Sequence, residues 1–416
     1  MHALPNLNDP AQAVAWLRSP AAIRARCGLV FAAAQADALA HFALRAERLE
    51  AAADYVAETM RADYPALEIP SHSRWRHFAV GGRDRWAELA GRLDAMPGAE
   101  IARIRFDLAL TSVLLDAGAG GRWRYREPES GDVYARSEGL AIASFRLFAS
   151  GAFSSDPGQP LRADAAGLAR VTEARLAEAL QVRPDNSLVG LAGRAALLRR
   201  LGETLAAAPA LFGAARPRAG NLFDYLAARA RGGRLAAATV LGAVLEGLGP
   251  IWPGGIALGG VNLGDVGRHP AVRTQDLTDG LVPFHKLSQW LAYSLVEPLE
   301  EAGIEVTDMD ALTGLPEYRN GGLLIDTGVL EAKHEGVLRD RHEVGAEVIV
   351  EWRALTVALL DELAPLVRAR LGLGEAELPL AKLLEGGTWS AGRRIARQRR
   401  PDGGPPITVA SEGTVF

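Results

Sequence analysis

The chain contains almost no cysteine, few aromatic residues and no long hydrophobic run. Its 416 residues include one cysteine, Cys27, which excludes an intrachain disulfide and any zinc or iron–sulfur site built from cysteines. Cys27 has Ala-rich, apolar neighbours, a context typical of a buried small hydrophobe rather than a nucleophile. The longest apolar run, residues 235–245, is well short of the roughly 20 residues that span a bilayer. We therefore expect no membrane insertion.

No excess of charge of one sign is present either. The formal net charge is -4, so the whole chain has no electrostatic attraction to nucleic acid or to an anionic membrane. Binding to either would need a local patch, and nucleic acid is not an expected partner. The first ten residues, MHALPNLNDP, lack a basic start followed by an apolar stretch, so no secretory signal is expected and the predicted location is the cytoplasm.

Composition and periodicity both predict a mainly α fold with few short strands. Alanine and leucine dominate and only 6% of the residues are aromatic. Apolar residues at alternating spacings of three and four, from Leu39 to Met60, predict one amphipathic helix over residues 37–61. Similar patterns predict helices over residues 10–33, 99–116, 136–150, 164–181, 189–208, 221–248, 284–302 and 341–371. The segment 248–268 is rich in Gly and Pro, which predicts a long loop with room for a short strand.

The last 40 residues differ in composition from the rest. We predict a helical catalytic body over residues 1–375, formed by one or two helical subdomains, and an Arg-rich tail over residues 376–416. Five arginines and no acidic residue lie between 393 and 400, a composition typical of a solvated or disordered tail. Six apolar residues nevertheless favour docking of the tail on the body: Trp389, Ile395, Ile407, Val409, Val415 and Phe416.

Sequence motifs give no support to metal or nucleotide chemistry. The eight histidines form no HxH or HExxH pattern, so we expect no metal site and no cofactor. A GxSxG motif, a Walker A loop and a GxGxxG motif after a strand are all absent. Phosphate-loop and nucleophilic-serine enzymes are therefore not indicated.

Residues 68–86, EIPSHSRWRHFAVGGRDRW, combine basic, hydroxyl and aromatic side chains. His72, Arg74 and Arg76 suit binding of an oxyanion or a phosphate, because arginine presents a planar fork of donors. The alternative is a solvated loop that Trp75 and Phe78 pin to the core.

Two further charged residues lie at predicted helix ends. Asp116 ends an apolar helix, where its charge opposes the helix dipole, so it either pairs with Arg122 or Arg124 or serves as a catalytic acid. Lys286 lies in the first turn of the helix over residues 284–302, where a cation is also unfavourable. A substrate phosphate at that helix start would make it favourable; otherwise Lys286 is a surface lysine.

The densest polar cluster is the segment EYRNGGLLID. It brings together Glu317, Arg319, Asn320 and Asp326 on a glycine-bearing turn between apolar helices. A carboxylate beside a fixed guanidinium is what a small polar substrate needs. The simpler interpretation is a helix-capping turn with a surface ion pair.

Several segments spread over nearly the whole chain resemble one family. The match lies in RSEGLAIASFRLFASGAFS, LVPFHKLSQWLAYSLVEPLE, LTGLPEYRNGGLLIDTGVL, GTWSAGRRIA and SEGTVF. These segments resemble the uracil catabolism protein 4 family of fungi and bacteria.

A more distant resemblance is to the queuosine salvage proteins, helical N-ribosyl hydrolases with a DNA-glycosylase-like fold. Their KRAQ, LTMFADYRVPQVL and EIRA segments resemble HKLSQ, LTGLPEYRNGGLL and EWRA here, in the same order. Lys286, Glu317, Arg319, Glu351 and Arg353 then occupy matching positions. This chain has Glu where that family has Asp at 317, and Asn-Gly-Gly at 320–322, which implies a leaving group other than queuine.

Together the two resemblances imply hydrolysis of a ribosylurea 5-phosphate to urea and ribose 5-phosphate. Glu317 would stabilise the oxocarbenium-like state, with Asp116 as the second candidate. Arg319 would keep Glu317 ionised, and Lys286, Arg74 and Arg76 would bind the phosphate. His72 or Asp326 would supply a proton or hydrogen bond to the leaving nitrogen.

Two other functions remain open. A non-catalytic partner protein of the pathway would show no turnover by itself, and a glycosylase-like protein would bind nucleic acid through the arginines at 393–400. The number of chains that associate is also open, with a homo-oligomer included.

Overall fold

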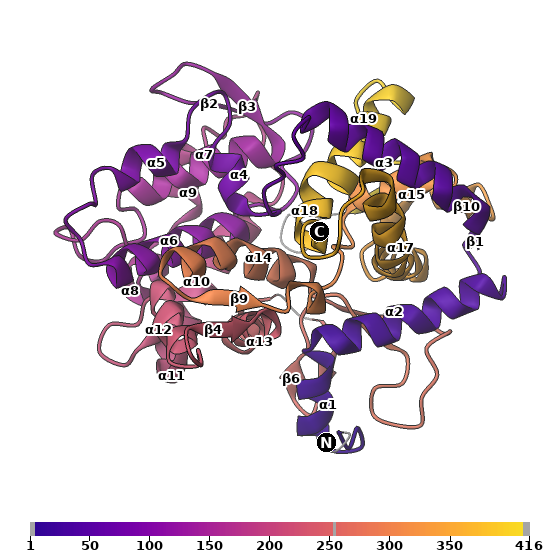
Figure 1. The fold of residues 1–416 in the computed structure, drawn as a ribbon. Coiled ribbons are helices and arrows are strands. Elements are labelled where there is room, and N and C mark those ends of the chain that lie inside the picture. Colours follow the sequence, from indigo (N-terminus) through magenta and orange to yellow (C-terminus); the bar gives the residue numbers. More distant parts are fainter. Residues whose placement is uncertain (1–4, 253–254, 411–416) are drawn as a thin grey trace. The chain divides into compact units, whose positions relative to one another are not determined.

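A computed structural model describes residues 5–252 and 255–410 of the protein (Figure 1). The described chain divides into two compact units. Unit 1 comprises residues 5–72, 255–289 and 308–410, and unit 2 comprises residues 73–252 and 290–307. The boundary at residues 289 and 290 falls within helix α14 (Lys286–Glu301).

Unit 1 is built mainly from helices. They are α1 (Pro10–Leu17), α2 (Pro20–Gln35), η1 (Ala46–Arg48), α3 (Leu49–Asp63), η4 (Met309–Ala311), α15 (Tyr318–Asp326), α16 (Gly336–Arg339), α17 (Glu347–Leu371), α18 (Leu380–Lys382), the π-helix η5 (Leu383–Trp389) and α19 (Ser390–Arg399).

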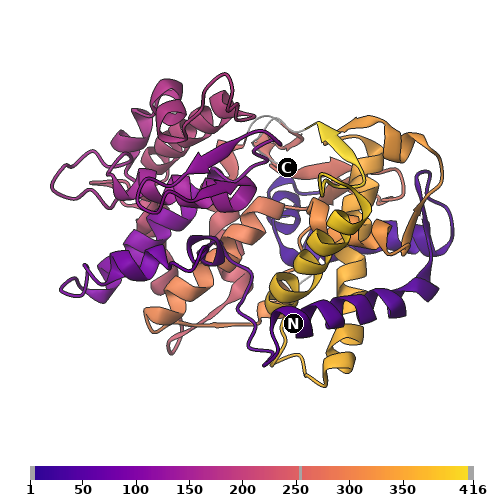
Figure 2. The same cartoon turned by 90° about the horizontal axis from the view of Figure 1, so that it is seen from above.

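Helix α17 forms the core of unit 1. It packs against α2, α3 and α15, and most of its side chains are buried, including Trp352, Leu355 and Leu359. Burying a side chain of this size stabilises the fold by roughly 1.5–3 kcal/mol relative to leaving it exposed. Helix α19 lies beside α3 in Figures 1 and 2 and also packs against α15. The segment around Glu317 is therefore held by the most buried part of the unit.

Short two-stranded sheets complete unit 1. Antiparallel pairs join β1 (Phe42–Leu44) to β10 (Leu330–Ala332), β5 (Ala257–Leu258) to β6 (Val261–Asn262) and β7 (Val266–Arg268) to β8 (Leu281–Pro283). A parallel pair joins β11 (Arg341–Glu343) to β12 (Thr408–Ala410).

Unit 2 is also helical. Its helices are α4 (Arg74–Phe78), α5 (Arg85–Ala90), α6 (Gly98–Leu114), α7 (Arg136–Ala149), α8 (Ala165–Ala169), α9 (Glu173–Ala179), α10 (Leu191–Ala207), α11 (Pro209–Phe212), η2 (Ala219–Asn221), α12 (Leu222–Ala227), α13 (Ala237–Leu248) and η3 (Gly249–Ile251). Its strands form an antiparallel pair, β2 (Arg124–Arg126) with β3 (Val133–Ala135), and a parallel pair, β4 (Arg234–Ala236) with β9 (Glu305–Thr307). The buried helix α6 packs against α4, α7, α10 and α12.

The predicted mainly α fold is confirmed, and so is the loop with short strands at 248–268. Five predicted helices are interrupted. The segments 37–61 and 341–371 begin with β1 and β11, the segment 10–33 breaks before Pro20, the segment 164–181 forms two short helices, and the segment 221–248 is divided by β4. Strand pairing holds β1, β4 and β11 in an extended conformation. The other two breaks are local, because Ser19 and Thr172 each cap the start of a new helix.

The C-terminal segment docks on unit 1, as its apolar residues predicted. Ile395 and Ile407 are buried, and α19 is a regular helix rather than a disordered tail. The predicted contributions of Val415 and Phe416 lie outside the described residues. Within residues 5–252 and 255–410, no helix combines the length and the apolarity that crossing a membrane requires.

Candidate functional site

Glu317 is the N-cap of helix α15. Its Oε1 accepts a hydrogen bond from the backbone N–H of Asn320 at 2.6 Å, and its Oε2 accepts one from the N–H of Arg319 at 2.8 Å. The carboxylate therefore satisfies two of the N–H groups that a helix start leaves without partners. Of the two sequence interpretations, helix capping is present, but the predicted turn is not, because both glycines of EYRNGG lie inside the helix.

Burial changes the acidity of this carboxyl group. Desolvation raises the pKa of Glu317, while the two backbone hydrogen bonds and the charges of Lys286 and Arg319 oppose it, and the net shift is upward. A carboxylate with a raised pKa is a stronger base than an exposed glutamate. Such a group takes a proton from water more readily than an exposed glutamate does.

Glycines allow the helices around Glu317 to approach closely. A Cβ added at Gly321 would lie 2.7 Å from the ring of Trp352 on α17, and one added at Gly392 of α19 would lie 2.2 Å from the carbonyl oxygen of Arg319. Glycine is required at both positions because neighbouring atoms leave no room for a side chain. Neither glycine has a positive φ. The backbone that carries Glu317 and Arg319 is thus clamped between α17 and α19.

Asn320 is almost completely buried beside this cap. Its Nδ2 donates to the carbonyl oxygen of Leu315 at 3.0 Å, whereas its Oδ1 has no hydrogen-bond partner among the described residues. Buried acceptors are rarely left unsatisfied in native proteins. The guanidinium of Arg319, in contrast, donates to the carbonyl of Gly403 at 2.7 Å and lies over the ring of Tyr318. Asn320 Oδ1 is therefore an acceptor that a ligand donor could satisfy.

Lys286 is the first residue of α14, as the sequence predicted, and its charge lowers the pKa of Glu317. Its backbone N–H donates to Asp265 Oδ2 at 2.9 Å. Asp265 also forms a two-pronged ion pair with Arg353 of α17, at 2.8 and 2.7 Å. Burial alone would raise the pKa of Asp265, but the charge and hydrogen bonds of Arg353 outweigh it and lower that pKa. His285 precedes Lys286 with a φ of 48°, a strained conformation for a residue other than glycine.

His72 is buried and paired with a carboxylate. Its Nδ1 lies 2.5 Å from Oε2 of Glu385 in the π-helix η5, which packs against α15. Single π-helical turns are found frequently at functional sites. The carboxylate fixes the orientation of the imidazole ring, and a ring held in place in this way can present its other nitrogen to a ligand.

Asp326 lies at the opposite end of α15 from Glu317. Its two carboxylate oxygens pair with Arg400 at 2.8 and 2.5 Å. Nine helical residues separate the two ends by about 13 Å, at 1.5 Å per residue. The structure therefore does not bring Asp326 and Glu317 to the same place.

Arg74 and Asp116 belong to unit 2 and form a buried ion pair with an N–O distance of 2.9 Å. The prediction that Asp116 pairs with Arg122 or Arg124 is wrong, because helix α4 places Arg74 beside the end of α6 instead. Arg74 also donates to Ser112 Oγ at 2.7 Å and to the carbonyl of Ser137 at 3.3 Å. Its guanidinium is fully buried among protein partners, so the polar cluster at 68–86 is not a solvated loop.

Arg76 of unit 2 pairs with Glu297, which lies on the part of α14 that belongs to this unit. The N–O distance is 2.5 Å, and Ser73 Oγ donates to the second oxygen of Glu297 at 2.7 Å. The residues predicted to bind one substrate are thus divided. His72, Lys286, Glu317, Arg319, Asn320 and Asp326 lie in unit 1, and Arg74, Arg76 and Asp116 in unit 2.

Sequence reasoning did not single out Asp265, His269 or Glu385. Asp265 follows a glycine-rich loop and Glu385 precedes two glycines, so neither is part of a recognisable motif. Glu351 was included through the family resemblance alone. The structure shows it fully buried, and its Oε2 lies 3.2 Å from His269 Nε2. These partners become evident only when the fold brings distant segments together.

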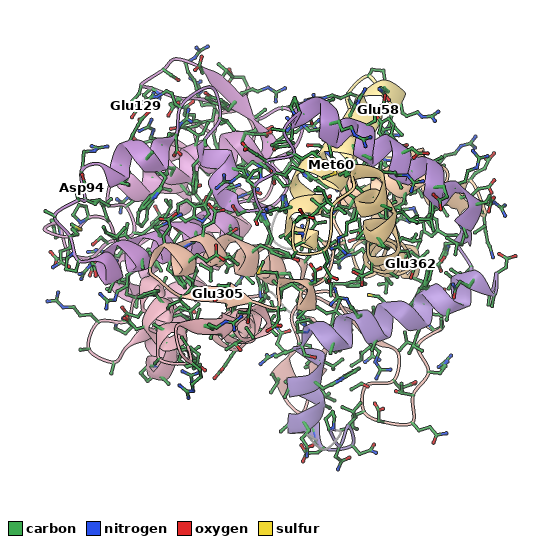
Figure 3. The ribbon with its side chains drawn as sticks, viewed as in Figure 1. Glu58, Met60, Asp94, Glu129, Glu305 and Glu362 are labelled. Atoms are coloured by element: carbon green, nitrogen blue, oxygen red, sulfur yellow. The ribbon has the colours of Figure 1, made fainter. Side chains whose placement is uncertain are left out.

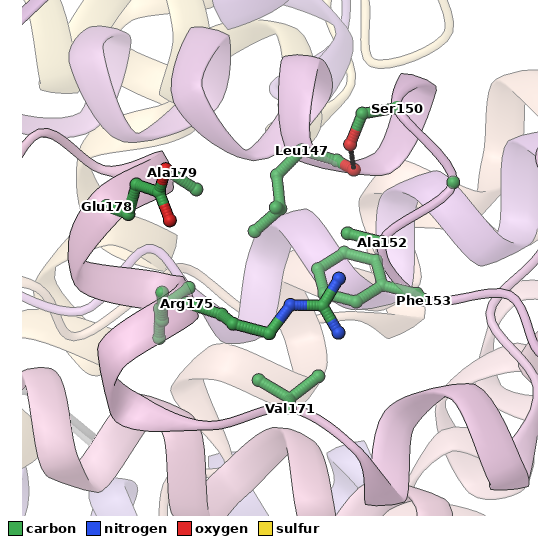
Figure 4. Close-up of a pocket in the computed structure, with 10 residues that line it drawn as sticks. Leu147, Ser150, Ala152, Phe153, Val171, Arg175, Glu178 and Ala179 are labelled. Carbon is green, nitrogen blue, oxygen red and sulfur yellow. Dashed lines mark hydrogen bonds between the residues drawn. The ribbon is translucent and has the colours of Figure 1, made fainter.

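Unit 2 also contains a pocket that none of these residues lines (Figure 4). It has a volume of about 320 Å³, and Arg175 extends between Phe153 and Val171. Its charged lining residues are Arg175 and Glu178, and none of the residues predicted from the sequence lines it.

Comparison with known proteins gives a consistent family assignment. Residues 16–416 match the family described as "Protein of unknown function (DUF1688)". The chain is 39% identical to "Protein urg3" of Schizosaccharomyces pombe, over 97% of this chain and 99% of that protein. It is 38% identical to "Uracil catabolism protein 4" of Lachancea kluyveri, over 90% of this chain and 92% of that protein. The predicted resemblance to the uracil catabolism protein 4 family is therefore confirmed, and the chain belongs to the DUF1688 family, which it matches over nearly its whole length.

Proposed function

We propose that the protein is an N-ribosyl hydrolase of uracil catabolism, acting on a ribosylurea 5-phosphate. The name of the L. kluyveri relative supports the pathway. The resemblance to queuosine salvage proteins around Lys286 and Glu317 supports cleavage of a ribosyl carbon–nitrogen bond. Water and ribosylurea 5-phosphate would give urea and ribose 5-phosphate.

The observation that carries this proposal is the carboxylate of Glu317, fixed at the start of α15 by two backbone N–H groups; desolvation raises its pKa and the charge of Lys286 opposes that shift. In the transition state positive charge develops on the ribose, and a fixed carboxylate in a water-poor site stabilises it. The bond from C1′ to the urea nitrogen breaks while the oxygen of water bonds to C1′. Glu317 takes one proton of this water, which its raised pKa favours.

The leaving nitrogen needs a proton to depart as neutral urea. His72, oriented by Glu385, is the donor that we assign to this step. Asn320 Oδ1, buried without a hydrogen-bond partner among the described residues, would accept a hydrogen bond from an N–H of urea or a hydroxyl of ribose. Lys286, at the start of a 16-residue helix, would bind the 5-phosphate. Arg74, Arg76 and Asp116 rank below these residues as candidates, because each already pairs with an oppositely charged side chain within unit 2.

The test is release of urea and ribose 5-phosphate from purified ribosylurea 5-phosphate. Glu317→Gln keeps the size and most of the capping geometry but removes the negative charge. We expect kcat to fall by about 100-fold to 10,000-fold, as for the loss of a catalytic base or a transition-state contact. Asp9→Asn is the matched control, since Asp9 caps α1 through the N–H of Gln12 at 2.9 Å. That variant should retain full turnover.

Two results would count against the proposal. Full activity of folded Glu317→Gln would show that Glu317 is not the catalytic carboxylate, and Asp116 would become the candidate. Absence of turnover in the wild-type protein, together with co-purification with other pathway enzymes, would favour the non-catalytic partner function.

A further inference from the structure

Three histidines and two glutamates from distant parts of the sequence meet in unit 1 around the start of α17. His41 immediately precedes β1, and His334 follows its partner strand β10. Glu347 and Glu351 lie four residues apart on α17, so they share one face of the helix. His269 contacts Glu351 from the segment after β7. We call these five residues the His–Glu cluster.

From this cluster we infer a binding site for a divalent transition-metal ion of the zinc type, with His41, Glu347 and Glu351 as ligands. One donor atom from each of the three residues lies within 4.8 Å of the others. His41 Nε2 is 3.9 Å from Glu347 Oε1. Zinc bonds to imidazole and carboxylate of about 2.0–2.2 Å place neighbouring donors about 3.4 Å apart in a tetrahedral site. Completing the coordination therefore requires the His41–Glu347 pair to close by about half an ångström and no pair to close by more than about 1.4 Å.

The charge of Glu351 supports a cation at this position. Its side chain is fully buried, and its Oε1 accepts hydrogen bonds from the backbone N–H groups of His41 at 3.1 Å and Phe42 at 2.8 Å. Its other contact is His269, and no arginine or lysine of the described chain pairs with it. Buried carboxylates in proteins are normally paired with a cation or bound to a metal. The two carboxylates of the cluster would balance the charge of one dication.

The histidines that do not bind the ion would support those residues that do. His41 Nδ1 lies 3.0 Å from His334 Nε2, so one of the two rings donates to the other. With His41 Nε2 on the metal, its Nδ1–H becomes the donor and the ring orientation is fixed, as is usual for metal-bound histidines. His269 performs the same task for Glu351. Nitrogen and carboxylate donors suit zinc, and three protein ligands leave a position for water.

This site differs from the catalytic proposal, and its test needs no substrate. The full-length protein, freed of metal with a chelator, is titrated with Zn²⁺ in a calorimeter, with Mg²⁺ as a comparison. We expect one Zn²⁺ per chain and much weaker binding of Mg²⁺. Glu347→Gln should reduce the Zn²⁺ affinity by about 100-fold or more, because loss of even a supporting residue costs about 10-fold to 100-fold.

The control is Glu362→Gln, an exposed glutamate on the same helix and labelled in Figure 3, which should bind Zn²⁺ like the wild type. Substitution with Co²⁺ gives a second reading, since its visible absorption bands should be present in the wild type and absent in Glu347→Gln. Glu347 is 43% exposed, so this change is compatible with folding; His334→Asn, also exposed, provides a second variant. Equal Zn²⁺ affinity in the wild type and in Glu347→Gln, or no Zn²⁺ binding at all, would overturn the inference.

Discussion

At the scale of single residues, Glu317 combines two tasks with opposite demands on its charge. As a helix cap it is stabilised when ionised, because two backbone N–H groups point at it. As a buried group it is stabilised when neutral, and burial has the larger effect on its pKa. The ionised form that the proposed mechanism needs is thus maintained at some cost in stability, a compromise that is common at active sites.

This compromise predicts a particular pH dependence. Because the pKa of Glu317 in the folded protein lies above its ordinary value of 4.5, the folded state holds a proton that the unfolded state has released. The contribution of this group to stability is therefore fully present below pH 4.5 and is lost as pH rises through the folded pKa. Glu317→Gln cannot ionise, so its free energy of unfolding should improve relative to wild type as pH rises. Urea unfolding of both proteins from about pH 4 to about pH 8 measures this difference.

A difference that is constant over the whole range would show that Glu317 titrates like an exposed carboxylate. A difference that changes in the other direction, with the wild type gaining stability as pH rises, would mean that capping and Lys286 outweigh burial. Either result would contradict the electrostatic description of the site.

At the scale of elements, the position of Glu317 depends on the packing of α15 against α17 and α19. Gly392→Ala should destabilise the protein by about 1–3 kcal/mol, because the added methyl group would meet the rigid carbonyl oxygen of Arg319 at 2.2 Å. The same backbone carries the Glu317 cap, so turnover should fall as well. Chemical denaturation and the urea-release assay measure the two effects.

Gly28→Ala on α2 is the matched control. A Cβ at Gly28 has nothing within 4 Å, so this change should stabilise the protein by roughly 0.5–1 kcal/mol through helix propensity. If close packing explains the glycine at 392, Gly392→Ala must lower the free energy of unfolding while Gly28→Ala raises it. If both substitutions stabilise the protein, close packing of α19 against α15 does not hold Glu317 in position.

Periodicity predicted the long helices well because their apolar faces are continuous. Helices α6, α7, α10 and α14 begin and end within two residues of the predicted bounds. Periodicity did not predict η5 and α19. Gly386 and Gly387 disfavour a helix and the five arginines repel one another, so contacts with α3 and α15 are needed to hold the segment. Prediction of the candidate site from the sequence is limited in the same way, because contacts between distant segments cannot be read from local patterns. The Glu317 cap follows from neighbouring residues, whereas the pairs His72–Glu385 and Arg353–Asp265 join segments that are 313 and 88 residues apart.

At the scale of the whole molecule, charge argues against the nucleic-acid alternative. The net charge is -4, and several of the arginines between 393 and 400 have partners within unit 1. Arg400 pairs with Asp326, the side chain of Arg399 donates to the backbone carbonyl of Asp326, and that of Arg394 to Thr59 Oγ1. The phosphate backbone of a nucleic acid would have to displace these internal partners and overcome repulsion from the net negative charge of the protein.

We therefore expect no tight binding to single-stranded RNA or DNA at physiological salt. Fluorescence anisotropy with a labelled oligonucleotide, from about 50 to about 200 mM salt, measures both affinity and its salt dependence. A protein that neutralises several phosphates loses affinity steeply over this range, with a slope near 0.7 per phosphate for a single strand. A steep slope that is abolished by Arg393→Ala and Arg397→Ala would establish a basic nucleic-acid site on α19. Weak binding that these changes do not alter would exclude a nucleic-acid site on α19 and leave the hydrolase and the non-catalytic partner protein as the two remaining functions.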